Sequence, residues 1–181
     1  MRRSTHEEIT SRRLTPRTLA RSRRNPVSVV VDNVRSLYNV GSIFRTSDGA
    51  RIEKLYLAGF TPRPPRREIE KTALGATETV PWEFVRDARQ LLNSLKAEGY
   101  TIACLELMEG SVPYYAIPPT SFPLCLVIGN EVTGVSAPLA ELCDLGLEIP
   151  MFGMKQSLNV AVAYGIAVFE LVRIFGQSHA G

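Results

Sequence analysis

The sequence predicts an α/β domain with a mainly parallel sheet and helices on both faces of that sheet. Short runs of β-branched and apolar residues alternate along the chain with helical segments, which is the order typical of strand–helix–strand units. The run at residues 124–128 is apolar at every position, as expected of a strand that is covered on both faces. With 181 residues, 45% of them hydrophobic, the chain can form one domain with a substantial core.

The first part of this domain is predicted to be a strand, a loop, a helix and a second strand. Residues 27–32 are mostly β-branched and form the first strand. The polar residues 33–39 follow as a loop, and 40–50 form a helix that turns its apolar side chains inward. The second strand covers residues 53–59.

The middle of the chain is predicted to be mainly loop and helix. Residues 60–67 are too rich in proline for regular structure, and 68–74 form a short helix. Residues 86–99 form a longer helix, because leucines recur there at helical spacing and Gly99 is a typical helix stop.

The last part of the chain supplies three more strands and two helices. Strands are predicted at 100–107, 124–128 and 145–149 from their apolar runs. A short helix is predicted at 138–144. The closing helix at 158–175 is apolar on every side, which indicates a buried helix.

Basic charge is concentrated before the first strand. Residues 1–26 hold eight arginines and two glutamates, a net +6, so the remaining residues carry −3 of the chain's total of +3. We interpret 1–26 as an arm, partly helical around 7–20 and flexible, that contacts a polyanion such as RNA. A solubilising tail is the alternative. Residues 27–181 form the folded domain.

The cysteines argue against a disulfide framework and against a metal site. There are three of them without a close-spaced pair, and they lie inside apolar runs: Cys104, Cys125 and Cys143. We therefore predict reduced thiols in a cytoplasmic protein that binds no metal. Four prolines interrupt the uncharged stretch 110–130, so no membrane helix is predicted there.

The usual nucleotide-binding patterns are absent. No two glycines are two positions apart, so the dinucleotide fingerprint is excluded. Gly129 and Gly134 have the spacing of a phosphate-binding loop, but valine and serine follow instead of lysine and serine or threonine. The two histidines, His6 and His179, lie near the ends of the chain, which leaves little for histidine chemistry.

What remains is a set of polar residues next to buried elements: Asn39, Arg45, Glu131, Ser157 and Asn159. Glu131 lies in a turn after a buried strand, and Ser157 and Asn159 lie in a loop before a buried helix. A polar turn and a polar loop of this kind predict a ligand pocket. Each residue also has a simpler role: Arg45 pairing with Asp48, Glu131 as a solvated acid, and the last two as helix caps.

Three segments carry a family resemblance. They are Asn39-x-Gly41-x-x-x-Arg45-Thr46, then VIGNEVTG at 127–134, and then Ile149-Pro-Met151 followed by SLNV at 157–160. In this order they resemble the motifs of the SpoU/TrmH-type RNA 2′-O-ribose methyltransferases, which belong to the SPOUT class. The similarity covers about residues 27–175.

The resemblance implies a C-terminal deep trefoil knot, S-adenosylmethionine bound among the knotted loops, and homodimers in which both subunits shape each site. The positions implied to contact the cofactor are Gly129, Ile149 and Leu158, with backbone groups of the loop at Ile149 to Met151 reading the adenine. Arg45 matches the arginine that helps to activate the ribose hydroxyl, and the other polar residues of the set surround it. Methyl transfer from a sulfonium needs alignment rather than a metal.

Two alternative functions stay open at this point. One is a non-catalytic RNA-binding protein on the same fold, and the other is a small-molecule α/β enzyme. The form of the third motif resembles tRNA guanosine methyltransferases more than ribosomal ones, but the sequence names neither the RNA nor the nucleotide. Substrate capture would fall to the arm, the loop at 60–67 and the dimer groove.

Overall fold

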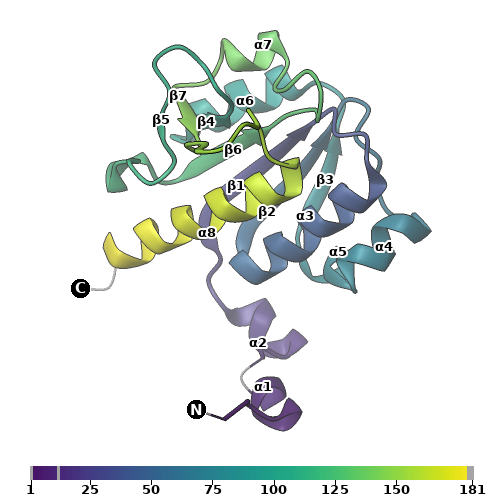
Figure 1. The fold of residues 1–181 in the computed structure, drawn as a ribbon. Helices are drawn as coiled ribbons and strands as arrows, with labels where there is room; N and C mark the ends of the chain where they lie inside the picture. Colours follow the sequence, from purple (N-terminus) through teal and green to yellow (C-terminus); the bar gives the residue numbers. More distant parts are fainter. Residues whose placement is uncertain (1, 12, 179–181) are drawn as a thin grey trace.

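The structure is a computed structural model that describes residues 2–11 and 13–178. Arg12, counted above among the arginines of the arm, and His179 lie outside the described residues. The described part forms a sheet covered by helices on both faces, with the N-terminal residues extending from one end (Figure 1). The predicted α/β class is confirmed.

The sheet has seven strands in the order β3-β2-β1-β6-β4-β7-β5, and every pairing among them is parallel. β6 lies between β1 and β4, so a late strand occupies the centre of the sheet. The strands are β1 (Asn25–Asp32), β2 (Ile52–Ala58), β3 (Trp82–Val85), β4 (Thr101–Leu105), β5 (Val112–Pro113), β6 (Leu124–Ile128) and β7 (Leu145–Glu148).

Helices cover the two faces unequally. The long helices α3 and α8, with the short α4 and α5, lie on one face, and α6 and α7 lie on the other (Figure 1). The 3-10 turn η1 precedes β6. The helices are α1 (His6–Ser11), α2 (Pro16–Arg21), α3 (Leu37–Ala50), α4 (Arg67–Ala73), α5 (Ala76–Thr79), α6 (Ala88–Ala97), η1 (Pro119–Ser121), α7 (Ala137–Ala140) and α8 (Val160–Ser178).

Successive side chains of the central strands enter two separate cores. Val29 and Val31 of β1 pack under α3 and α8, whereas Val30 faces the leucines of α6. The five residues of β6 are all buried, in agreement with the prediction for 124–128. A hydrogen bond of 2.7 Å between the hydroxyls of Ser47 and Tyr164 joins α3 to α8 inside the first core.

The sequence prediction missed two strands and the helix α5. β3 has only four residues and includes the exposed Glu83, so it lacks an apolar run, yet it pairs with β2 from Leu55 onward. β5 has two residues, one of them a proline, and forms an edge of the sheet beside β7. Both strands are defined by pairing partners distant in sequence, which local patterns do not reveal.

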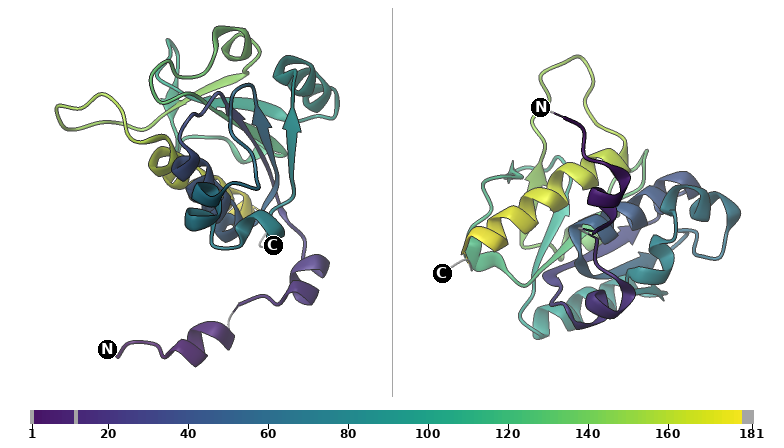
Figure 2. Two further views of the ribbon diagram at one scale, coloured as in Figure 1. Left: turned by 90° about the vertical axis from the view of Figure 1, so that its right-hand side faces the viewer. Right: turned by 90° about the horizontal axis from the view of Figure 1, so that it is seen from below.

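The arm contains two short helices, where the sequence predicted only a partly helical stretch around 7–20, and it lies away from the sheet (Figure 2). It joins the domain through Arg24, whose guanidinium donates to the carbonyls of Ile52 at 3.1 Å and Thr79 at 2.7 Å. β1 begins at Asn25, two residues before the predicted start. The division of the chain into an arm and a methyltransferase domain stays a prediction.

Among the described helices, only α8 is long and apolar enough to cross a membrane by length and composition. Its buried residues, which include Tyr164 and Leu171, pack into the core that α8 shares with α3 and the sheet. We therefore interpret α8 as a core helix. Its outer face still carries the half-exposed Val162 and Phe169.

Candidate active site

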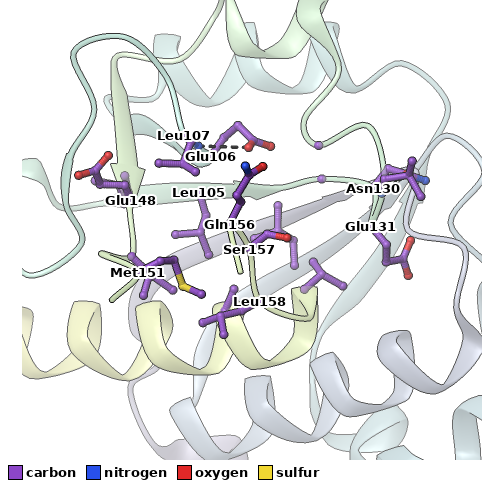
Figure 3. A pocket seen from close by; sticks show the side chains of 18 residues that line it. Leu105, Glu106, Leu107, Asn130, Glu131, Glu148, Met151, Gln156, Ser157 and Leu158 are labelled. Atoms are coloured by element: carbon purple, nitrogen blue, oxygen red, sulfur yellow. Dashed lines mark hydrogen bonds between the residues drawn. The ribbon is translucent and has the colours of Figure 1, made fainter. Parts of the chain in front are cut away.

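A pocket of about 190 Å³ lies at the carboxyl ends of β4, β6 and β7 (Figure 3). Ligands in open parallel sheets bind at this edge, where the loops that follow the strands converge. The pocket is built from the end of β4, the turn after β6, the loop after β7 and the first turn of α8. Its lining includes Leu105, Glu106, Gly129, Glu131, Gly134, Glu148, Ile149, Met151, Gln156, Ser157, Leu158 and Val160.

The four residues predicted to contact the cofactor all line this pocket: Gly129, Ile149, Met151 and Leu158. Two of the polar set, Glu131 and Ser157, line it as well. In Figure 3, Met151 and Glu131 lie on opposite sides with Ser157 and Leu158 between them. Their assignment to cofactor or substrate stays a proposal, taken up below.

Glu131 is the centre of a hydrogen-bond cluster. Its carboxylate accepts from the Asn39 side-chain amide at 2.9 Å and from the backbone N–H groups of Arg35 at 3.1 Å and Ser36 at 3.2 Å. Asn159 donates to the Asn39 side-chain oxygen at 3.1 Å. The cluster therefore joins the N-terminus of α3, the turn after β6 and the N-terminus of α8.

Glu131 is exposed, in agreement with its simpler role as a solvated acid, but it also accepts three hydrogen bonds. Partial burial of this carboxyl raises its pKa, but the hydrogen bonds from Asn39 and from backbone N–H groups outweigh that effect and hold the pKa below its ordinary value. Glu131 is thus ionised at neutral pH and fixed in position. It also lies near the positive end of the α3 dipole.

We expect Glu131→Gln to lose stability at neutral pH only. Because the folded carboxyl has the lower pKa, its contribution is present above the unfolded pKa and disappears as the pH falls through the folded value. At pH 7 the loss should be about 1 kcal/mol, a figure reduced for the solvent exposure of this side chain. Urea unfolding over a pH series measures it, with Glu109→Gln as the control on an exposed loop glutamate. A loss that persists at acid pH would contradict the ionic role.

Asn159 caps α8 in addition to contacting Asn39. Its side-chain oxygen accepts from the backbone N–H groups of Ala161 at 2.9 Å and Val162 at 3.4 Å, so α8 begins at Val160 rather than at 158. Ser157 is not the cap. Its side chain lies at the pocket without a hydrogen-bond partner among the described residues, which leaves its hydroxyl available to a ligand.

Arg45 lies outside the pocket of its own chain. It is on the exposed surface of α3, and it forms no ion pair among the described residues. The predicted alternative, pairing with Asp48, is not formed. The Asp48 carboxylate instead accepts from the Thr79 hydroxyl at 2.6 Å.

Sequence reasoning missed Asn130 and Glu106. The buried Asn130 donates to the Asn33 carbonyl at 2.7 Å and accepts from the backbone of Val132 at 2.8 Å, which shapes the turn that carries Glu131. The Glu106 carboxylate accepts from the backbone N–H of Val135 at 3.2 Å and faces the pocket. Glu106 directly follows β4 and Asn130 is the second residue after β6, and a position at the end of a parallel strand is the signal that could have identified them.

Metal ligands are not gathered anywhere in the described part of the chain: it contains no group of three or more histidine, cysteine, aspartate or glutamate residues arranged to hold an ion.

An all-parallel α/β sheet, with a mixed polar and apolar pocket at the carboxyl ends of its strands, defines a ligand-binding domain of the open-sheet class. The model of the SpoU rRNA Methylase family matches residues 26–169, so the chain belongs to this family. The resemblance stated from the three motifs is confirmed.

Relatives of known activity agree with this membership. The chain is 35% identical to the tRNA (guanosine(18)-2′-O)-methyltransferase of Aquifex aeolicus over 87% of this chain and 74% of that protein. It is 34% identical to the 23S rRNA (guanosine(2553)-2′-O)-methyltransferase RlmP of Bacillus subtilis, over 79% of this chain and 56% of that protein. The chain thus spans roughly half to three quarters of these relatives.

Solved structures show the same fold. The A. aeolicus TrmH/SpoU tRNA modifying enzyme superposes with a TM-score of 0.80 at 32% identity, covering 91% of this chain and 85% of that chain. The SpoU methyltransferase AviRb from Streptomyces viridochromogenes, in complex with the cofactor AdoMet, gives 0.77 at 27% identity, covering 88% of this chain and 63% of that chain.

Proposed function

We propose that this protein transfers a methyl group from S-adenosylmethionine to a ribose 2′-hydroxyl of tRNA or rRNA. One observation carries the proposal beyond family membership. The carboxylate–amide cluster of Glu131, Asn39 and Asn159 is assembled at the mouth of the pocket from three separate elements. A non-catalytic RNA-binding protein would have no need to keep this cluster beside a cofactor pocket.

The pocket suits S-adenosylmethionine in its chemistry. The apolar side chains of Ile149, Met151 and Leu158 offer packing for an adenine ring, and the backbone of the loop after β7 offers hydrogen-bonding groups. The carboxylates of Glu106 and Glu148 make the lining negative, which favours a cationic ligand. AdoMet-bound structures of the AviRb methyltransferase and of an rRNA methyltransferase from Sinorhizobium meliloti share this fold.

The reaction forms a bond between the ribose oxygen and the methyl carbon. The carbon–sulfur bond breaks, its electron pair stays on sulfur, and the hydroxyl proton is released. Glu131 fixes Asn39, and Asn39 with Ser157 and Asn159 orients the ribose. Arg45 stabilises the negative charge that develops on the ribose oxygen; its high pKa makes it a poor base by itself. No metal is needed for this chemistry.

We further propose a homodimer. The loop before α8 projects from the body of the molecule (Figure 2), and it carries Phe152 and Met154 at 98% and 99% exposure. A second copy that covers this loop and the outer face of α8 would remove these apolar side chains from water. It would also let Arg45 of one subunit complete the pocket of the other. Sedimentation as a monomer at micromolar concentration would contradict this proposal.

A C-terminal trefoil knot is also proposed. Its support is the similarity to SpoU structures and the placement of β6 and β7 between strands formed earlier in the chain. Mechanical unfolding from the two ends tests it, because a tightened knot shortens the extended chain.

We also propose that the protein acts in the cytoplasm, where tRNA and ribosomal RNA are available.

The arm is proposed to capture RNA. Deleting residues 1–23 should weaken RNA binding and flatten its dependence on salt, because each lost phosphate contact removes about 0.7 to 0.9 from the log–log slope. Cofactor affinity should not change. Fluorescence titration with labelled RNA at several salt concentrations gives the slope, and an unchanged slope would return the arm to the role of a solubilising tail.

The function itself is tested by mapping ribose methylation in total tRNA and rRNA from cells with and without this protein. One missing 2′-O-methyl group is expected in the deleted strain, restored by the wild-type protein. Unaltered methylation, together with intact RNA binding in vitro, would favour the non-catalytic alternative.

A further inference from the structure

A second hollow lies beside the N-terminus of α3, outside the cofactor pocket. Its lining combines apolar, cationic and acidic side chains: Arg35, Leu37, Phe60, Pro62, Arg66 and Glu68. Phe60 is 84% exposed, which places a nearly complete aromatic ring in solvent. The family motifs do not include this residue.

The backbone that carries Phe60 is anchored on both sides. The Phe60 N–H donates to the Asn33 side-chain oxygen at 2.9 Å. The next residue, Thr61, is buried, and its hydroxyl donates to the Val31 carbonyl at 2.9 Å and accepts from the Val34 N–H at 3.2 Å. An exposed phenylalanine on a fixed backbone, in one hollow with the apolar Leu37 and Pro62, offers a ligand an apolar face that is already in place.

This hollow is connected to the proposed site through Glu131. The Glu131 carboxylate lines the cofactor pocket and accepts from the backbone N–H of Arg35, whose side chain lines the hollow. A ribose held at the Glu131 cluster would therefore have the cofactor pocket on one side and the hollow on the other.

The charges in the hollow fit a nucleotide better than a phosphate alone. Arg35 and Arg66 can each meet a phosphate. The Glu68 carboxylate would repel a phosphate, but it can accept hydrogen bonds from the N–H groups of a base edge. Arg63, from the same loop, does not line the hollow, because its guanidinium is stacked over the Phe84 ring, 4.4 Å from the ring centre.

We infer that the hollow receives a nucleobase of the RNA, at or next to the methylated nucleotide, which stacks on Phe60 with flanking phosphates on Arg35 and Arg66. This inference rests on the proposed function, because RNA is the ligand. Stacking on an aromatic ring is the usual way in which an unpaired base is held, and it works for every base because each has a π-face.

The test compares side chains at position 60 that differ in aromatic character. Phe60→Leu keeps an apolar side chain without a ring, and Phe60→Trp keeps a ring. With the whole 181-residue chain and an RNA substrate, Phe60→Leu and Phe60→Ala should weaken RNA binding by about tenfold, whereas Phe60→Trp stays close to wild type. The salt slope and the S-adenosylmethionine affinity should not change in any of them.

The arginines give an independent readout. Arg35→Ala and Arg66→Ala should each lower the salt slope by about one. Arg89→Ala, an exposed arginine on α6 against the other face of the sheet, is the matched control and should leave the slope unchanged.

Two results would overturn the inference. If Phe60→Leu binds RNA with wild-type affinity, no base stacks on Phe60. If Phe60→Ala changes the oligomeric state, the ring contacts a second copy of the chain instead of RNA. Failure of the proposed enzyme function is a separate outcome. Wild-type protein that binds RNA through Phe60 but transfers no methyl group would keep the base site and reject the methyltransferase.

Discussion

Arg45→Ala should abolish methyl transfer while folding and S-adenosylmethionine affinity stay close to wild type. The side chain is exposed on α3 and makes no ion pair within the described chain, so its removal breaks no ion pair that supports the fold. If it stabilises the developing alkoxide, the rate should fall roughly 100-fold or more. Single-turnover methyl transfer to RNA measures the rate, and calorimetric titration measures cofactor affinity.

The controls separate charge from geometry. Arg45→Lys should also fail, because an ammonium does not reproduce the planar fork of a guanidinium. Arg89→Ala on α6 should keep full activity. Full activity in Arg45→Ala homodimers would contradict the catalytic role.

Mixed dimers test whether the site is shared between subunits. Arg45→Ala can be combined with Leu158→Trp, which should fill the proposed cofactor pocket of its own subunit. If Arg45 serves the neighbouring pocket, one of the two mixed sites retains both groups and activity returns in part. Absence of activity in these dimers, with subunit exchange verified, would count against the shared site alone.

The fold was predictable where local pattern and tertiary environment agree. The buried run that became β6 and the helical spacing that became α6 were both readable from residues close in sequence. β3 and β5 were missed because their strand state comes from pairing with Leu55 and Leu147, far away in the chain. The order of strands likewise cannot be read from local periodicity.

The candidate site was predictable as a set of residues but not as a geometry. The motifs predicted that Gly129, Ile149 and Leu158 contact one ligand, and in the structure all three line one pocket. This arrangement is expected because the loops after parallel strands converge. They did not indicate that Asn39 and Glu131, 92 positions apart, form a direct hydrogen bond. Nor did they place Arg45 away from the pocket of its own chain, since the orientation of a helix depends on its packing.

Gly129 is expected to be needed for folding as well as for the cofactor. The resemblance assigns this glycine to the cofactor site, where the absence of a side chain would let the backbone approach the ligand closely. The structure adds a second reason: an added Cβ would overlap the backbone of Gly134 and Val135, within the protein itself. Residues 130 and 134 are held there by two hydrogen bonds, Asn130 N–H to the Gly134 carbonyl at 2.9 Å and Gly134 N–H to the Asn130 carbonyl at 3.0 Å.

Gly129→Ala should therefore be enough to damage the protein, without the larger valine. Backbone atoms cannot move aside as a flexible side chain can, so the turn that carries Glu131 would have to shift, at a cost of about 3 kcal/mol or more. Chemical unfolding should show this loss together with weakened S-adenosylmethionine binding. Gly153→Ala is the matched control in the loop after β7, because a Cβ there meets nothing within 4 Å. A Gly129→Ala protein with wild-type stability and lost cofactor binding would restore the original explanation, in which the glycine serves the ligand alone.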